Sequence, residues 1–359
     1  MKIGICGNYG VSNIGDEAIL KSLETICKKL NPGAEIIVFG KGMLFPVGFR
    51  SFLKSFFAPS LWLRPLRALC ACDIFILGGG GLFSDEEGVL IPFFWACQGF
   101  LALLLKKPLL CVGISIGRLN FISRAMVRTL LKRARYIIVR DQKSHTLITD
   151  WGINAFKTSD LALLLRQSES EPHSETANEK GYIVISTRSF HGLDDFLYKK
   201  LALFCDFVST EFGLQIRLLP FKDGDSNDAQ IMNKIFEQAE RKDSISIEKF
   251  SGDLGRIMGI LRNAELVVAM RLHAGILSLI TGTPFIPLVY MEKVGDFWLK
   301  LDEIPAVHIT EKLLDDLVNT FHKVYSNRRE QRGLMLSLRN RLASEAEKTE
   351  GLLAPFLQK

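Results

Sequence analysis

The chain has 359 residues, of which 48% are hydrophobic and 23% charged, a balance that is typical of folded globular proteins and excludes global disorder. Because this length exceeds what one hydrophobic core usually supports, we expect two domains. Lys and Arg outnumber Asp and Glu by 45 to 39, giving a net charge of +6. Such a mild excess suits small anions or a phospholipid surface, and it argues against nucleic acid as a partner.

The cysteines predict a reducing compartment. There are seven, an odd number, and most lie within apolar runs, so we expect small buried thiols rather than disulfides. Cys70-Ala71-Cys72 has no second Cys or His pair at metal-ligand spacing, which argues against a metal site. Met1 leads directly into a strand-like segment, so no signal peptide is expected and the predicted location is cytoplasmic.

The first predicted domain, residues 1–166, alternates short apolar strands with helical patterns. A strand at Lys2–Cys6 is followed by a glycine-rich turn and a helix at Ala18–Leu30. Further strands are expected at Glu35–Phe39, Asp73–Leu77, Leu109–Ile114 and Tyr136–Val139. Alternation of this kind predicts a parallel sheet with helices on both faces.

Two glycine-rich segments of this domain are candidate ligand sites. The first ends in Gly15, Asp16 and Glu17 and is neither a GxGxxG fingerprint nor a P-loop, which weakens the case for NAD or ATP. Its acidic pair either caps the following helix or meets a sugar hydroxyl. Gly79 and Gly80 belong to a second predicted glycine loop, which either lets a ligand approach the backbone or lets a helix pack tightly.

Two apolar segments could be mistaken for membrane spans. Val89–Leu105 is short for a span and is interrupted by Pro92, Gln98 and Gly99, which favours a buried or interfacial helix. Met43–Cys72 interleaves aromatic with cationic residues. That pattern fits either peripheral contact with an anionic membrane surface or a basic helix covering the domain.

A polar, acidic stretch at 167–180 predicts a linker between domains. A second alternation follows over the predicted second domain, residues 181–325. Its expected elements are strands Gly181–Ser186, Gln215–Leu219, Ser244–Ile247 and Leu266–Ala269 with helices Asp194–Phe212, Asp228–Gln238 and Asp253–Asn263. A C-terminal helix within 326–359 is expected to pack back across the domains. The predicted fold class is therefore α/β, with two Rossmann-like, doubly wound domains facing a cleft.

Cations follow several predicted strands at their carboxyl ends, where ligands bind in open α/β sheets. Arg271 and His273 follow the strand at Leu266–Ala269, and Arg140, Arg188 and Lys293 each follow another apolar strand. A guanidinium can grip a carboxylate or phosphate with two hydrogen bonds, and an imidazole can move a proton near neutral pH. Each cation alone could instead be solvated or form a surface ion pair, Arg140 with Asp141 for example. Together they favour an anion with more than one charged group.

Six segments, in this order over nearly the whole chain, carry a resemblance to a known family: GNYGVSNIGDEAIL, GGGGLFSDE, GISIGRL, VRDQKSHTLITDWG, SDLALLL and MRLHAGILSLITGTPFIPLVYMEKVGDF. They look like the polysaccharide pyruvyl transferase family. Its members are similar in fold to two-domain glycosyltransferases of the B type. They transfer pyruvate from phosphoenolpyruvate to a sugar as a ketal.

The resemblance implies roles for particular residues. His273 is expected to be the acid/base, and Arg140, Arg271 and Lys293 to grip phosphoenolpyruvate. Leu272, Arg188, Gly15, Asp16, Glu17, Gly79 and Gly80 complete the predicted substrate-binding residues. No metal and no cofactor are expected, because phosphoenolpyruvate is itself the donor.

The resemblance also implies a biological setting, in which the acceptor is a lipid-linked saccharide destined for cell-surface polysaccharide. Two alternatives stay open. One is a B-type glycosyltransferase that uses a nucleotide sugar, and the other is a non-catalytic glycan-binding protein with the same fold.

Overall fold

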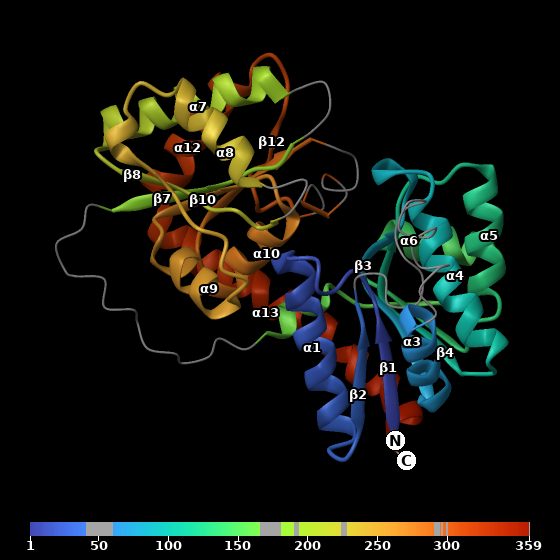
Figure 1. Ribbon diagram of the computed structural model, residues 1–359. Coiled ribbons are helices and arrows are strands. Elements are labelled where there is room, and N and C mark those ends of the chain that lie inside the picture. Colours follow the sequence, from blue (N-terminus) through green and yellow to red (C-terminus); the bar gives the residue numbers. More distant parts are fainter. Residues whose placement is uncertain are drawn as a thin grey trace. The chain divides into compact units, whose positions relative to one another are not determined.

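The computed structural model describes residues 1–40, 60–165, 181–189, 194–223, 228–290, 295, 297–298 and 301–358. It contains two six-stranded sheets whose strands all pair in parallel, with helices packed on them (Figure 1). The predicted α/β class with two doubly wound domains is confirmed. Among the described residues, no helix is long and apolar enough to cross a membrane.

The chain divides into two compact units. Unit 1 comprises Met1–Val11, Asp16–Leu164 and Leu342–Lys359, and unit 2 comprises Ser12–Gly15 and Leu165–Arg341. Each unit therefore includes a short segment from the far side of the predicted linker. That linker, 167–180, lies outside the described residues, and the limits 1–166 and 181–325 stay predictions.

Unit 1 contains the first sheet, in the order β2-β1-β3-β4-β5-β6. The strands are β1 (Lys2–Cys6), β2 (Glu35–Phe39), β3 (Ile74–Phe83), β4 (Leu109–Ile116), β5 (Tyr136–Val139) and β6 (Phe156–Lys157). The helices are α1 (Ile14–Leu30), α3 (Ser60–Ala71), α4 (Ile91–Leu104), α5 (Phe121–Leu131) and α6 (Gln142–Asp150), with 3-10 turns at Asp85–Glu87 and Leu161–Leu164. Because helices cover both faces, the central strand β4 is buried along its whole length and reads as a continuous apolar run.

Unit 2 contains the second sheet, in the order β12-β11-β10-β7-β8-β9. The strands are β7 (Tyr182–Ser186), β8 (Gln215–Leu218), β9 (Ile245–Ile247), β10 (Leu266–Ala269), β11 (Phe285–Val289) and β12 (Val307–His308). The helices are α7 (Asp194–Phe212), α8 (Asp228–Gln238), α9 (Leu254–Asn263), α10 (Leu272–Thr281) and α12 (Leu313–Ser326), with a 3-10 turn at Lys242–Ser244. Helix α13 (Arg328–Leu357) belongs to unit 2 up to Arg341 and to unit 1 from Leu342. Strand order reverses beside β7, the point at which ligand crevices form in such sheets.

The C-terminal part of α13 packs within unit 1. Thr349 Oγ1 donates to Thr158 Oγ1 at 3.1 Å in a buried contact, and Lys29 forms an ion pair with Glu350 at 2.8 Å. The expected C-terminal helix is therefore present, and its last turns contribute to the fold of the first unit.

Two elements of unit 1 differ from the sequence-based expectation. The predicted glycine loop is wrong, because β3 continues through Gly78–Gly81 to Phe83, with positive φ at Gly79 and Gly80 and a register shift beyond Gly80. Helix α1 begins at Ile14, so that Asp16 and Glu17 lie in its first turn rather than before it. The acidic pair there suits the positive end of the helix dipole.

All seven cysteines are free, as expected. Cys70 is exposed and Cys97 is half-buried, and the other five are buried. The apolar segment Val89–Leu105 contains the helix α4 (Ile91–Leu104), in line with the helix expected there.

Candidate functional site

The junction of β10 and α10 has an unusual cap. Strand β10 is buried at every position, and the chain leaves it through the buried Met270. Arg271 is the N-cap of α10 and makes no side-chain cap hydrogen bond. Because first-turn N–H groups lack partners within any α-helix and carry its positive dipole end, a cation at this position is unfavourable unless anions compensate it.

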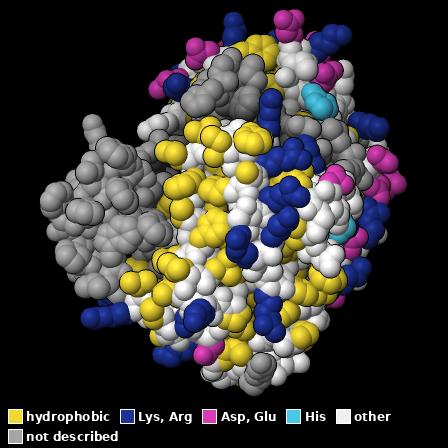
Figure 2. All heavy atoms as spheres, turned by 90° about the vertical axis from the view of Figure 1, so that its right-hand side faces the viewer, with side chains coloured by type: hydrophobic (Ala, Val, Ile, Leu, Met, Phe, Trp, Pro, Cys, Tyr) yellow, Lys and Arg dark blue, Asp and Glu magenta, His cyan; other side chains and the backbone are white. Residues whose placement is uncertain are grey.

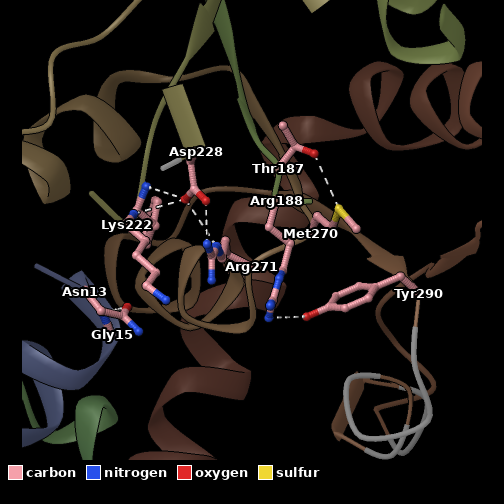
Figure 3. A network of polar contacts seen from close by, with 10 residues as sticks. Asn13, Gly15, Thr187, Arg188, Lys222, Asp228, Met270, Arg271 and Tyr290 are labelled. Carbon is pink, nitrogen blue, oxygen red and sulfur yellow. Dashed lines mark hydrogen bonds and ion pairs between the residues drawn. The ribbon is translucent and has the colours of Figure 1, made fainter. Parts of the chain in front are cut away.

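Asp228, the first residue of α8, supplies one compensating charge (Figure 3). Its carboxylate is fully buried and accepts hydrogen bonds from Arg271 Nε at 3.1 Å and from Arg271 Nη2. The same carboxylate accepts from the backbone N–H groups of Phe221 and Lys222, each at 3.0 Å. Asp228 therefore fixes the guanidinium and the segment after β8 together.

Arg271 keeps donors beyond this ion pair. A guanidinium has five N–H groups, of which the described bonds to Asp228 use one on Nε and one on Nη2. The Arg271 side chain is 13% exposed, so solvent or a ligand reaches it. This arrangement suits a held guanidinium that still binds an anion.

His273 lies in the first turn of α10 against the segment that begins α1. A Cβ atom added at Gly15 would lie 2.1 Å from His273 Nδ1, so only glycine leaves room for the ring in this position. The segment is fixed in unit 2 by two backbone bonds, Ile14 N–H to Phe221 O and Asp223 N–H to Ser12 O, each at 3.0 Å. Gly15 therefore sets where the imidazole lies.

The two strands that flank β10 bring further polar groups to the same edge of the sheet. Arg188 follows β7 and Tyr290 follows β11, and Arg188 Nη1 donates to the Tyr290 hydroxyl at 3.2 Å (Figure 3). Thr187 Oγ1 donates to Met270 Sδ at 3.4 Å in a buried contact. This contact joins the ends of β7 and β10. The edge thus carries two guanidinium groups, a phenol and an imidazole.

Arg140 of unit 1 is more enclosed. It follows β5, its side chain is 5% exposed, and its Nη1 donates to the fully buried Asp160 at 2.6 Å. The suggested pairing with Asp141 is wrong, because Asp141 caps α6 by accepting from the backbone N–H of Ser144 at 2.8 Å. These contacts favour a structural role for Arg140, and its place in the substrate site stays a prediction.

The acidic pair of α1 organises the glycine-rich segment of unit 1. Asn8 Nδ2 donates to Asp16 Oδ2 at 2.7 Å, and the Gly10 N–H donates to Glu17 Oε1 at 2.7 Å. Gly80 lies beside Asp16, since a Cβ added there would be 3.3 Å from Asp16 Oδ1.

Tyr9 completes this segment by donating to Gly78 O at 2.6 Å. Burial raises the pKa of Tyr9 well above its usual value, and the negative charge of Asp16 raises it further, which keeps the phenol protonated as a donor.

A family model, polysaccharide pyruvyl transferase, matches residues 13–291. The chain belongs to the polysaccharide pyruvyl transferase family. The match includes the β10–α10 junction, together with Arg188 and Tyr290. The family is one of transferases that act on saccharides, and a sequence search of curated proteins adds no match.

Several solved structures share the fold of this pyruvyl transferase family member. UDP-GlcNAc 2-epimerase from Neisseria meningitidis, bound to UDP-GlcNAc, is 9% identical with a TM-score of 0.64 over 100% of both chains. The S. aureus MnaA–UDP co-structure is 10% identical with a TM-score of 0.60 over 96% of this chain and 92% of that one. UDP-GlcNAc 2-epimerase from Methanocaldococcus jannaschii is 12% identical with a TM-score of 0.54 over 88% of this chain and 92% of that one. At such identities the likeness concerns the fold.

The structure distributes the predicted site residues between the units. Unit 2 holds Gly15, Arg188, Arg271, Leu272 and His273, whereas unit 1 holds Asp16, Glu17, Gly79, Gly80 and Arg140. Lys293 lies outside the described residues. Within the part of the chain that the structure describes, no group of three or more His, Cys, Asp or Glu side chains could hold a metal ion.

Sequence reasoning missed Asp228, Lys222 and Tyr290. Asp228 stands at the start of a predicted helix, where an acidic residue is ordinary, so nothing local marks it as the partner of Arg271. Tyr290 could have been found from the sequence, because it follows the carboxyl end of an apolar strand, as Arg188 does.

Proposed function

We propose that the chain transfers pyruvate from phosphoenolpyruvate to a saccharide, forming a ketal. The observation that carries the proposal is Arg271 as the cationic N-cap of α10, whose own side chain makes no cap hydrogen bond to that helix. Phosphoenolpyruvate brings a carboxylate and a phosphate, which would compensate both the guanidinium and the helix dipole. Membership of the family supports the same reaction.

The roles follow from the groups at this edge. Arg271 would bind one anionic group of the donor through the N–H groups that Asp228 does not engage. Arg188, held against Tyr290, would bind the other, with Lys293 as a further candidate. His273 would supply a proton to the enol carbon, which becomes a methyl group and leaves an oxocarbenium-like carbon. The cations stabilise the negative charge on the donor throughout.

The remaining steps balance without an additional reactant. One sugar hydroxyl adds to the electron-deficient carbon and loses its proton. A second hydroxyl of the same sugar then displaces inorganic phosphate and closes the ketal. Phosphoenolpyruvate and a diol thus give the ketal and phosphate, and neither a cofactor nor a metal ion takes part in the proposed scheme.

We further propose that the acceptor is a lipid-linked saccharide of the cell surface, modified at the cytoplasmic face of a membrane. Asp16, Glu17, Gly79 and Gly80 are the candidate acceptor contacts, since carboxylates and backbone polar groups suit sugar hydroxyls. Of the predicted membrane-contact segment 43–72, residues 43–59 lie outside the described residues.

Thermal unfolding with and without ligands tests the donor. Saturating phosphoenolpyruvate, at a hundred times its Kd, should stabilise the protein by about 2.7 kcal/mol, and Arg271→Ala should abolish that gain. A shift with a UDP-sugar and none with phosphoenolpyruvate would favour a nucleotide-sugar glycosyltransferase instead. A glycan that binds equally well to His273→Ala, without phosphate release by the unaltered protein, would favour a binding protein.

A further inference from the structure

Unit 1 exposes an apolar patch at the N-terminal ends of α4 and α5. Phe121 is 86% exposed, Ile122 is 76% exposed, and Val89, Leu90 and Phe93 are each more than half exposed. We call these five residues the apolar tip. Exposed clusters of large hydrophobic side chains are uncommon on protein surfaces and often mark a site of interaction.

The N-terminal ends of α4 and α5, which carry the five residues, are tied to each other. Asp85, just before α4, accepts hydrogen bonds from the Asn120 N–H at 2.5 Å and from Ser123 Oγ at 2.8 Å. Helices α4 and α5 also pack closely, because a Cβ added at Gly99 would lie 2.8 Å from Leu130 Cδ1. The apolar tip is therefore one rigid feature.

Among the elements that follow the tip, α4 is uncharged and the segment 118–135 is basic. Helix α4 has no charged residue over its whole length. From Arg118 to Arg135 the charged residues are all basic, and those exposed are Arg118, Arg124, Arg128, Lys132, Arg133 and Arg135. Figure 2 shows this face, with hydrophobic side chains gathered beside Lys and Arg. The exposed Glu86 lies at the border, and Asp85 is engaged by Asn120 and Ser123.

The apolar tip lies at the same edge of the first sheet as the carboxyl ends of its strands. Val89 and Leu90 follow β3, and Phe121 and Ile122 follow β4, each after a short connection. Both therefore lie beyond the carboxyl ends of parallel strands, the edge at which Asp16 and Gly80 meet.

We propose that the apolar tip and the basic residues of the segment 118–135 dock unit 1 onto an anionic phospholipid surface. The apolar side chains would enter the headgroup region while the basic ones meet lipid phosphates, as in other interfacial helices. A symmetric dimer through this face fits less well, because it would bring the basic residues of two copies together. The proposal does not depend on the reaction above, since vesicle binding is measured without turnover.

Vesicle sedimentation tests the proposal on the full chain. Vesicles of phosphatidylcholine with phosphatidylglycerol should pellet the protein, less so at high salt, whereas pure phosphatidylcholine should not. The double variant Phe121→Ser/Ile122→Ser should bind at least roughly tenfold more weakly. Arg124→Gln/Lys132→Gln should also weaken binding, by roughly tenfold at low salt. Both pairs are exposed, so folding should survive, and thermal unfolding checks this.

Matched controls lie in unit 2. Leu203→Ser removes another exposed hydrophobic side chain, and Lys312→Gln/Lys323→Gln removes two exposed charges; both should bind vesicles like the unaltered protein. Three results would overturn the proposal: no sedimentation with either vesicle, equal binding by the Phe121→Ser/Ile122→Ser variant, or equal losses in the unit 2 controls. A dimer in solution that this double variant dissociates, without lipid binding, would assign the tip to self-association.

Discussion

Each unit places an arginine within two residues of the end of a buried strand and pairs it with a buried aspartate. Arg140 pairs with Asp160 in unit 1 and Arg271 with Asp228 in unit 2. The helix that follows differs, because α6 is capped by the Asp141 carboxylate whereas α10 has the arginine itself as its N-cap. Both arginines are paired, but the first helix has an anionic cap that suits its dipole and the second has a cationic one that opposes it. The chemistry of the cap distinguishes them.

The two units also offer a matched pair of histidines. His273 lies in the first turn of α10 and His145 in the first turns of α6, where its Nε2 is 3.1 Å from Ala155 O. We expect His273→Ala to lower the rate of phosphate release from phosphoenolpyruvate by roughly 10²–10⁴-fold, the usual contribution of a general acid. His145→Ala should leave the rate near normal and cost about 1 kcal/mol of stability. Equal rates in both variants would remove His273 from the proposed reaction.

The two buried aspartates should contribute similarly to stability. Asp228→Ala and Asp160→Ala each leave a largely buried guanidinium without its partner, so each should lower the free energy of unfolding by about 3–5 kcal/mol. Urea unfolding measures this loss.

The isosteric variants then separate structure from binding. Asp228→Asn should also reduce the thermal shift with phosphoenolpyruvate, because it releases Arg271, whereas Asp160→Asn should leave that shift unchanged. If Asp160→Asn also lost the thermal shift with phosphoenolpyruvate, the Arg140–Asp160 pair would not be purely structural.

The strands and most helices could be predicted because their signals are local. Buried parallel strands such as β10 are apolar at every position, and amphipathic helices repeat over a few residues. The contacts that shape the site are not local. Asp228 and Arg271 lie 43 residues apart, and the sequence around either residue does not identify the other as its partner. The run Gly78–Gly81 was misassigned as a loop because glycines have no side-chain pattern that separates an irregular strand from a turn.

Gly15 tests whether the imidazole position matters. In Gly15→Ala the new methyl would meet the His273 ring, so the ring must move, and a displacement of about 1 Å can cost roughly 100-fold in rate. Gly33→Ala is the control, since its nearest neighbour would be 3.8 Å away. Rates of phosphate release should fall in the first variant and stay normal in the second. Normal rates in both would show that the ring tolerates movement.

The units should also differ in their response to alkaline pH, because unit 1 holds more buried thiols. Burial raises the pKa of Cys27 and of Cys111 from 9.0 to about 12 and that of Cys72 to about 11, whereas unit 2 has the single cysteine Cys205, with its pKa also raised by burial. A thiol with a raised pKa stabilises the folded state fully below the unfolded-state value. That contribution is lost as the pH rises from about 9 towards the folded-state value.

Cys111→Ala isolates one of these thiols. Each such group should make the free energy of unfolding fall by roughly 1.4 kcal/mol per pH unit above the unfolded-state pKa. Between pH of about 9 and about 11, Cys111→Ala should therefore show a slope shallower by that amount in urea unfolding, whatever its stability at neutral pH. Cys70→Ala, which removes an exposed thiol, should keep the slope of the unaltered protein. Identical slopes in all three proteins would mean that the Cys111 thiol does not contribute to the alkaline loss.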